Sequence, residues 1–66
     1  MSSLGSEFPL EQQRVRRLRD LYVEIGPAGA FGLMVIDDVL SRAEQVAISG
    51  DVIAMLGVFQ EMRDLK

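Results

Sequence analysis

The amino-acid sequence predicts a small all-α domain of two to three helices, and three observations support this fold class. Apolar residues recur every three or four positions through most of the 66-residue chain, as on the buried face of a helix. Each of the two prolines stands where a helix can begin, because the first turn needs no hydrogen bond from its own N–H. No Asn-Gly turn lies between segments that alternate apolar and polar residues, so a sheet is not expected.

The first helix is predicted over residues 10–25, directly after Pro9. Its apolar stripe consists of Val15, Leu18, Tyr22 and Ile25. Gly26 suits the left-handed conformation that ends many helices, and Pro27 prevents continuation while opening the next helix. A proline therefore marks the start of this helix, and a Gly-Pro pair marks its end.

Residues 1–8 carry no periodic apolar pattern. Residues 5–8, Gly-Ser-Glu-Phe, are the peptide that two adjacent common cloning sites encode in frame. We therefore expect residues 1–8 to be a cloning remnant or a flexible tail, and residues 9–66 to form the single helical domain.

Neither a secretory signal nor a membrane span is expected. No basic stretch followed by a long apolar segment opens the chain. The longest apolar run, residues 27–36, is about half of the roughly 20 residues that a membrane-spanning helix needs. The sequence predicts a cytoplasmic protein that makes no membrane contact.

The second helix is predicted over residues 27–49, with Ile36 and Val39 at the centre of a broad apolar face. Gly29 and Gly32 lie on the same face. Each glycine costs roughly 1 kcal/mol of helix stability relative to alanine. Either the two glycines let another backbone approach closely, or they only loosen the start of the helix.

The third helix is predicted over residues 51–65. Gly50 is expected to cap the preceding helix, and Asp51 to act as an N-cap whose carboxylate accepts hydrogen bonds from the next turn. The apolar face of this helix is made up of Val52, Met55, Leu56, Phe59 and Met62. Further apolar residues on both flanks extend that face over more than half of the helix surface.

Several apolar residues have no obvious cover within one chain. Phe31 and Met34 lie opposite the stripe of the second helix, and Ile53 and Val58 flank the stripe of the third. Burying a Phe or Met side chain is worth roughly 1.5 to 3 kcal/mol, a large share of the stability that so short a chain can reach. We therefore expect an intertwined homodimer whose interface includes Phe31, Met34, Val35, Ile53 and Val58. A docking patch for a different protein is the alternative.

The chain is acidic overall, with a net charge of −3, but residues 10–25 carry four arginines against three acids. Three explanations of these arginines remain: ordinary solvent-exposed side chains of a helix, a site for an acidic protein partner, or a site for a nucleic acid. Nucleic acid is disfavoured because no continuous basic face forms. Tyr22 is either a core residue or an interface anchor. For a protein partner, the predicted binding residues are Arg16, Arg19 and Tyr22.

No catalytic, metal-binding or cofactor-binding residues are predicted. The chain contains neither His nor Cys, and no general base accompanies its serines. Asp37 and Asp38 lie about 100° apart on a helix, which disfavours a shared magnesium site. They are better explained as a solvated helix edge on which Asp38 reaches Arg42. The sequence predicts a protein that is not an enzyme.

Three segments resemble small early-region proteins of transposable temperate phages of Pseudomonas. They are residues 14–22 (RVRRLRDLY), 25–32 (IGPAGAFG) and 49–52 (SGDV). That group includes a quorum-sensing anti-activator, a short helical dimer that binds the host's LuxR-type regulator and also a type IV pilus assembly ATPase. The resemblance covers residues 11–65 and implies a protein that inhibits host proteins by stoichiometric binding.

The sequence and the resemblance together predict a non-enzymatic helical homodimer that binds and inhibits a host regulatory protein. Two alternatives remain open. One is a small DNA-binding regulator that uses the arginines of the first helix, and the other is a structural assembly subunit that forms larger oligomers without any partner.

Overall fold

The computed structural model describes residues 3–66, which form three α-helices and one short 3-10 helix, with no strand among them. α1 (Leu4–Ile25) is joined by the 3-10 helix η1 (Gly26–Gly29) to α2 (Ala30–Ser49), and α3 (Val52–Asp64) follows after a two-residue turn. The predicted all-α fold class is confirmed.

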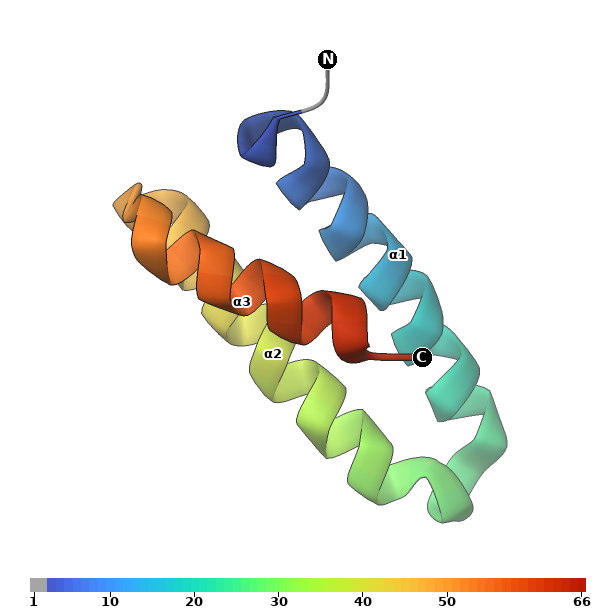
Figure 1. The fold of residues 1–66 in the computed structure, drawn as a ribbon. Helices are drawn as coiled ribbons and strands as arrows, with labels where there is room; N and C mark the ends of the chain where they lie inside the picture. The colour runs from blue at the N-terminus through green and yellow to red at the C-terminus, as the bar shows by residue number, and fades with distance from the viewer. Residues whose placement is uncertain (1–2) are drawn as a thin grey trace.

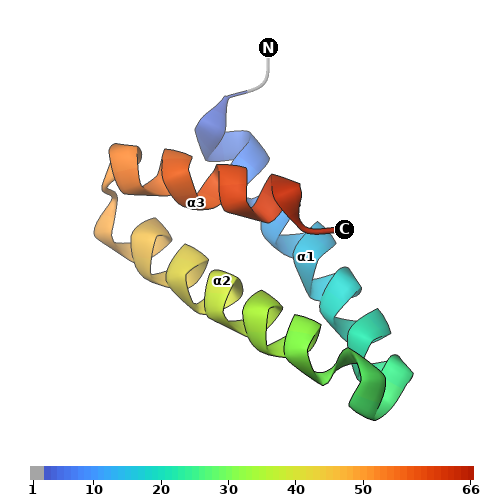
Figure 2. The ribbon, with the colours of Figure 1, turned by 60° about the horizontal axis from the view of Figure 1, so that its bottom comes forward.

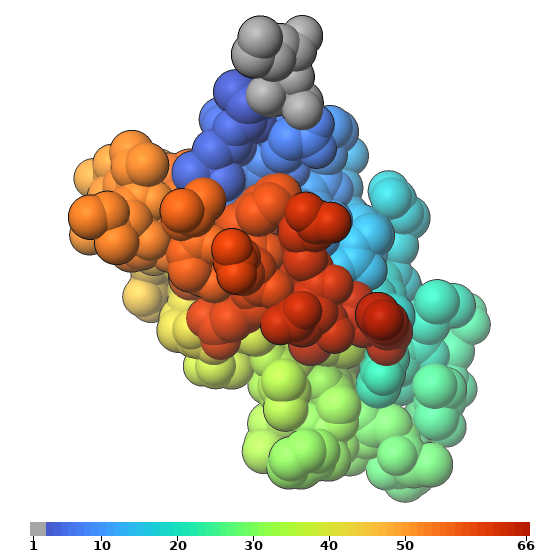
Figure 3. Space-filling model, viewed as in Figure 1, coloured from blue at the N-terminus to red at the C-terminus, as the bar shows by residue number. Residues whose placement is uncertain are grey.

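α1 and α2 run antiparallel and diverge from η1, so that the two helices form a wedge (Figure 1). α3 packs across this wedge and contacts both helices, as the rotated view also shows (Figure 2). The C-terminus therefore lies against α1. In the space-filling view α3 covers the centre of one face, whereas η1 and the start of α2 project beyond it (Figure 3).

The hydrophobic core lies where the three helices meet. Its buried side chains are Phe8, Val15, Ile36, Val39, Ala43, Val58 and Met62. Partly buried apolar residues, among them Leu18, Tyr22 and Phe59, pack around this cluster. Most of the apolar stripes predicted for residues 10–25 and 27–49 therefore face the core, but Ile25 at the end of the first stripe is 57% exposed.

The N-terminal segment belongs to the fold. α1 begins at Leu4, and the side chain of Ser3 caps it by accepting a hydrogen bond from the backbone N–H of Ser6. Six helical residues thus precede the predicted start at residue 10, and Pro9 lies inside the helix. The prediction that Pro9 marks a helix start is wrong.

Phe8 shows why this segment matters. Its side chain is only 1% exposed, and its ring stacks near that of Phe59 with the two centroids 6.4 Å apart. The expectation that residues 1–8 stand outside the domain is therefore wrong for residues 4–8, because Phe8 is one of the largest side chains in the core. Met1 and Ser2 lie outside the described residues.

The connection between α1 and α2 is tight because of its glycines. Gly26 adopts a positive φ of 80°, which few other residues tolerate. A Cβ on Gly29 would lie 2.9 Å from the carbonyl oxygen of Tyr22, and a Cβ on Gly32 would overlap the Tyr22 ring. The predicted close approach of another backbone is confirmed at Gly29, whereas at Gly32 the close neighbour is the side chain of Tyr22. The start predicted for the second helix at residue 27 was too early, because residues 26–29 form a 3-10 turn before α2 begins.

The turn between α2 and α3 follows the predicted chemistry. Gly50 adopts the left-handed conformation at φ 71° and ψ 13°, and the Asp51 carboxylate accepts a hydrogen bond of 3.1 Å from the backbone N–H of Ala54. The two caps end one helix and start the next within two residues, and so bring α3 back along α2.

Candidate protein-binding surfaces

The described chain exposes many large apolar side chains to solvent. It exposes 4603 Å² in total, about a tenth more than the roughly 4,200 Å² that scaling with mass gives for a monomer of this size. Eleven large apolar residues are exposed, namely Leu10, Leu21, Val23, Ile25, Phe31, Met34, Val35, Ile48, Val52, Ile53 and Leu56. Surface of this kind is typical of a protein that binds other proteins.

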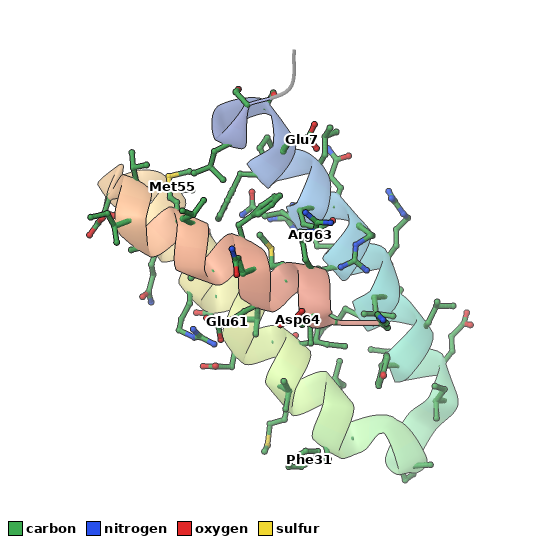
Figure 4. The ribbon with its side chains drawn as sticks, viewed as in Figure 1. Glu7, Phe31, Met55, Glu61, Arg63 and Asp64 are labelled. Atoms are coloured by element: carbon green, nitrogen blue, oxygen red, sulfur yellow. The ribbon has the colours of Figure 1, made fainter. Side chains whose placement is uncertain are left out.

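One group of these residues, Phe31, Met34 and Val35, lies at the start of α2 and is called the turn patch below. Phe31 is 76% exposed and Met34 is 66% exposed. Figure 4 shows Phe31 at the end of the molecule where α1 turns into α2, away from α3. Helix geometry explains the exposure of Met34, which points away from the face on which Ile36 and Val39 are buried. Phe31 and Val35 are exposed because α3 does not cover this end of α2.

A second group, called the corner patch below, lies at the junction of α2 and α3. Its members are Ile48, Val52, Ile53 and Leu56, of which Ile53 is 86% exposed. At 1.5 Å per residue, about 20 to 25 Å of α2 separates Ile48 of the corner patch from the turn patch. In one monomer the exposed residues of the predicted dimer interface therefore fall on two surfaces at opposite ends of the molecule.

Val58 does not belong to either patch. It is 6% exposed and lies in the core with Met62. In this fold Val58 is not exposed for the predicted dimer interface, because α3 turns this side of its broad apolar face toward α1 and α2. Ile53 and Leu56 lie on the solvent side of the same helix.

The three residues predicted to bind a partner occupy different environments. Arg16 is exposed on the outer side of α1. Arg19 forms an ion pair with Asp37 of α2, and this contact raises the pKa of the Arg19 guanidinium. Tyr22 is half-buried, and its hydroxyl donates a hydrogen bond of 3.2 Å to the backbone oxygen of Lys66. Of the three, only Arg16 is free of an intramolecular contact in the hydrogen bonds described here.

Arg14 holds the C-terminal end of α3 against α1. Its guanidinium donates hydrogen bonds to the backbone oxygens of Met62 (2.6 Å) and Leu65 (3.0 Å), and two more to the carboxylate of Glu11. The hydrogen bonds to Glu11 raise the pKa of Arg14. Carbonyls at the end of a helix have no partner within that helix, so a cation placed there satisfies them and favours the helix dipole.

A shallow hollow lies beside this contact, between α1 and α3. It has a volume of about 640 Å³ and is lined by Glu7, Leu10, Glu11, Arg14, Arg17, Phe59 and Arg63. A neighbouring hollow of about 610 Å³ shares Phe59 and Arg63 and reaches Leu56 and Lys66. Figure 4 shows Arg63 on the side of α3 that faces α1. The two hollows together are called the α1/α3 groove below.

The groove was not predicted from the sequence, although one signal for half of it was available. Leu10, Arg14, Arg17 and Leu21 recur at helical spacing along a second line of α1, beside the buried stripe. The contribution of α3 had no such signal. Which residues of α3 face Arg17 depends on how α3 crosses α1, and this crossing is set by packing over the whole domain.

The acidic pair on α2 is engaged by arginines. Asp37 binds Arg19, and Asp38 binds Arg42 across one helical turn at 3.0 Å. Arg42 also binds Glu61 of α3 at 2.7 Å; these hydrogen bonds raise the pKa of Arg42 and lower that of Glu61. The predicted contact between Asp38 and Arg42 is confirmed. Within residues 3–66 no three acidic side chains come together in a way that could hold a metal ion.

None of the described helices is both long enough and apolar enough to cross a bilayer. Comparisons of the chain with protein-family models, with curated proteins and with solved structures found no match.

Proposed function

We propose that this chain is a non-enzymatic protein–protein interaction module, which acts as a homodimer and inhibits a host regulatory protein by binding it. The observation that carries the proposal is the exposed apolar surface, in particular Phe31 and Met34 of the turn patch. Such residues cost a small domain stability and solubility unless another protein covers them.

The turn patch is the proposed dimer surface. It lies at the projecting end of the molecule (Figure 3), where a second copy can approach without meeting α3. A two-fold axis at this patch would place Phe31, Met34 and Val35 of one protomer against the same residues of its partner. Ile53 then belongs to the corner patch, at the other end of α2, and stays free for a different protein.

The resemblance to phage early-region proteins supports the choice of target. It favours a LuxR-type transcription activator of the bacterial host, and a type IV pilus assembly ATPase as a second target. An inhibitor of this kind acts by covering a surface that its target needs, so it requires no catalytic group or cofactor. The proposed site of action is the host cytoplasm, where both targets are accessible.

DNA binding is the weaker candidate for a specific reason. Arg14, Arg19 and Arg42 each bind carboxylates of the same chain, and phosphate would have to compete with these contacts. The acids that pair with them also repel a phosphate backbone.

The dimer is tested by light scattering coupled to size-exclusion chromatography. We expect the wild type to elute with the mass of a dimer, and the Phe31→Ser, Met34→Ser double variant with that of a monomer. Ile53→Ser is the matched control, because it removes an equally exposed apolar residue outside the turn patch and should leave the dimer intact. A monomeric wild type would contradict the proposal, and larger assemblies would favour a structural subunit.

The inhibitor function is tested with a purified LuxR-type activator from Pseudomonas and its DNA site. We expect the wild type to bind the activator and release it from DNA. Binding of the wild type to the DNA duplex alone, with a steep dependence on salt, would instead support the DNA-binding alternative. If the activator stays on its DNA at saturating wild-type protein, the inhibitor proposal fails.

A further inference from the structure

We infer that the α1/α3 groove binds an acidic amphipathic helix of the partner protein. This inference rests on the proposed function, because it names the surface that the module uses and the chemistry of the segment that it recognises. It assigns the main contacts to Arg17, Arg63, Leu10 and Phe59. It departs here from the sequence prediction, because Arg16 lines neither hollow and the fold already uses Arg19 and Tyr22 internally.

Some charged groups at the groove are already paired within the chain, and others are free to bind a partner. Glu11 is neutralised by two hydrogen bonds from Arg14, which also binds backbone carbonyls of the α3 end. Arg17 and Arg63 line the same hollow, and neither takes part in an ion pair among the described residues. Within residues 3–66, two unpaired guanidinium groups therefore remain at the groove of a chain whose net charge is −3.

The apolar part of the groove is formed by one residue from each helix. Leu10 of α1 is 57% exposed, and the ring of Phe59 from α3 lines both hollows. The Arg63 guanidinium carbon lies 6.0 Å from the centre of the Phe59 ring, which places the cation over the ring. Arg63 is thereby positioned at the edge of an apolar surface, and no carboxylate among the described residues forms an ion pair with it.

The arrangement suits discrete carboxylates around an apolar anchor better than a row of phosphates. Glu7 and Asp64 also line the groove and would repel a continuous anionic backbone. A helix with leucine or phenylalanine on one face can place that side chain on Leu10 and Phe59, while its flanking Asp or Glu residues accept hydrogen bonds from Arg17 and Arg63. Guanidinium groups bind carboxylates in a two-pronged geometry that adds orientation to affinity.

The test uses the full-length protein and a synthetic peptide of about 16 residues, long enough to form a helix. The peptide carries leucine at every third or fourth position and glutamate on either side of that stripe. Titration into isotope-labelled protein, followed by NMR, should shift the backbone signals of Leu10, Arg17, Phe59 and Arg63. A peptide with lysine in place of every glutamate is the charge control.

Arg17→Glu and Arg16→Glu form a matched pair of variants. They make the same change of charge on adjacent residues of α1, but only Arg17 lines the groove. We expect Arg17→Glu to weaken peptide binding at least about tenfold, since a charge-assisted hydrogen bond is lost and a repulsive charge is gained. Arg16→Glu should change it less than about twofold. Unchanged circular dichroism melts of both variants show that the fold is intact.

Three results would overturn the inference: equal binding by both variants, signal changes centred on the turn patch, or equal binding of the lysine peptide. Duplex DNA that displaces the glutamate peptide from the groove would overturn the choice of an acidic helix.

The same variants separate this inference from the proposed function. If Arg17→Glu still binds the LuxR-type activator as the wild type does, the groove is wrong and the inhibitor function stands. If the wild type binds no activator at all, the inhibitor function fails, whatever the peptide does.

Discussion

Phe8 and Phe31 have the same side chain, but their environments are opposite. Phe8 is 1% exposed and stacks near Phe59 in the core, whereas Phe31 is 76% exposed at the projecting end of the molecule. Both lie in well-formed helices, so secondary structure does not explain the difference. The difference arises from α3, which covers the half of the wedge that contains Phe8 and leaves the start of α2 uncovered.

This contrast separates residues that hold the fold together from residues that are available to another protein. Stability should depend on the side chains that α3 covers, and binding on those that it leaves open. The same contrast recurs for two glycines, two arginines and two glutamates. Each pair gives a variant for one role and a matched control for the other.

The largest expected effect is that of Phe8→Ala. Truncating a buried phenylalanine costs about 3 to 5 kcal/mol, which is comparable to the whole stability expected for a chain of this size. We expect the variant to be largely unfolded, or to melt far below the wild type, when thermal unfolding is followed by circular dichroism.

Phe31→Ala is the control for that measurement. At low protein concentration, where a dimer dissociates, it should change the free energy of unfolding by less than about 0.5 kcal/mol. A Phe8→Ala melt close to that of wild type would show that residues 4–8 do not belong to the core after all.

Gly32 and Gly57 provide the next comparison. A Cβ at Gly32 would overlap the Tyr22 ring, whereas a Cβ at Gly57 would meet no atom within 4 Å. We expect Gly32→Ala to destabilise by about 1 to 3 kcal/mol, because the ring must move and its hydrogen bond to Lys66 is lost. Gly57→Ala should stabilise by about 1 kcal/mol through helix propensity alone. Urea unfolding measures both, and a change of the same sign in the two variants would contradict the packing found at Tyr22.

Sequence periodicity predicted what depends on neighbouring residues along a helix. It placed Ile36 and Val39 on the inner face of α2, and it located the Gly50–Asp51 boundary from cap chemistry. It failed where a residue's environment depends on a distant helix. Phe8 was not predicted to be a core residue, because the segment around it matches a cloning-site peptide and precedes a proline. No neighbouring residue indicates its contact with Phe59, which comes from a distant helix.

The role of Arg14 in holding α3 against α1 was not predicted, for the same reason. Its important partners are backbone oxygens near the end of α3, and these carry no side-chain signature. The exposure of Met34 was easier to predict, since its angle to Ile36 along the helix places it on the side opposite the core. Val58 shows the limit of that reasoning, because α3 is apolar on more than half of its surface and only packing decides which part is buried.

Arg14 and Arg17 test the polar contact between α1 and α3. Arg14→Gln removes the hydrogen bonds to Glu11, and its shorter side chain also loses those to the carbonyls of Met62 and Leu65. Because the side chain of Arg14 is partly exposed, we expect a loss of about 1 to 2 kcal/mol in urea unfolding. Arg17→Gln has no such contacts to lose and should stay within about 0.5 kcal/mol of wild type. Equal losses of stability in the two variants would mean that the hydrogen bonds from Arg14 do not hold the end of α3 in place.

The smallest expected effect concerns Glu61, which binds Arg42 between α2 and α3. The hydrogen bond from Arg42 lowers the pKa of Glu61 in the folded protein, so the unfolded chain takes up the proton first as the pH falls. The stabilisation is therefore present above the ordinary glutamate pKa of about 4.3, and is lost as the pH falls through the lower folded value. Because both side chains are exposed, its size should be below about 0.5 kcal/mol.

Glu61→Gln should accordingly lower stability slightly at neutral pH and leave it unchanged at pH values where the wild-type carboxylate is protonated. The measurement is urea unfolding across the acid range, with Glu44→Gln as control, since Glu44 forms no ion pair among the described residues. If both glutamine variants change the pH dependence equally, the ion pair adds nothing at this contact. The packing of Val39 and Ala43 against Val58 and Met62 would then be enough to hold α3 in the wedge.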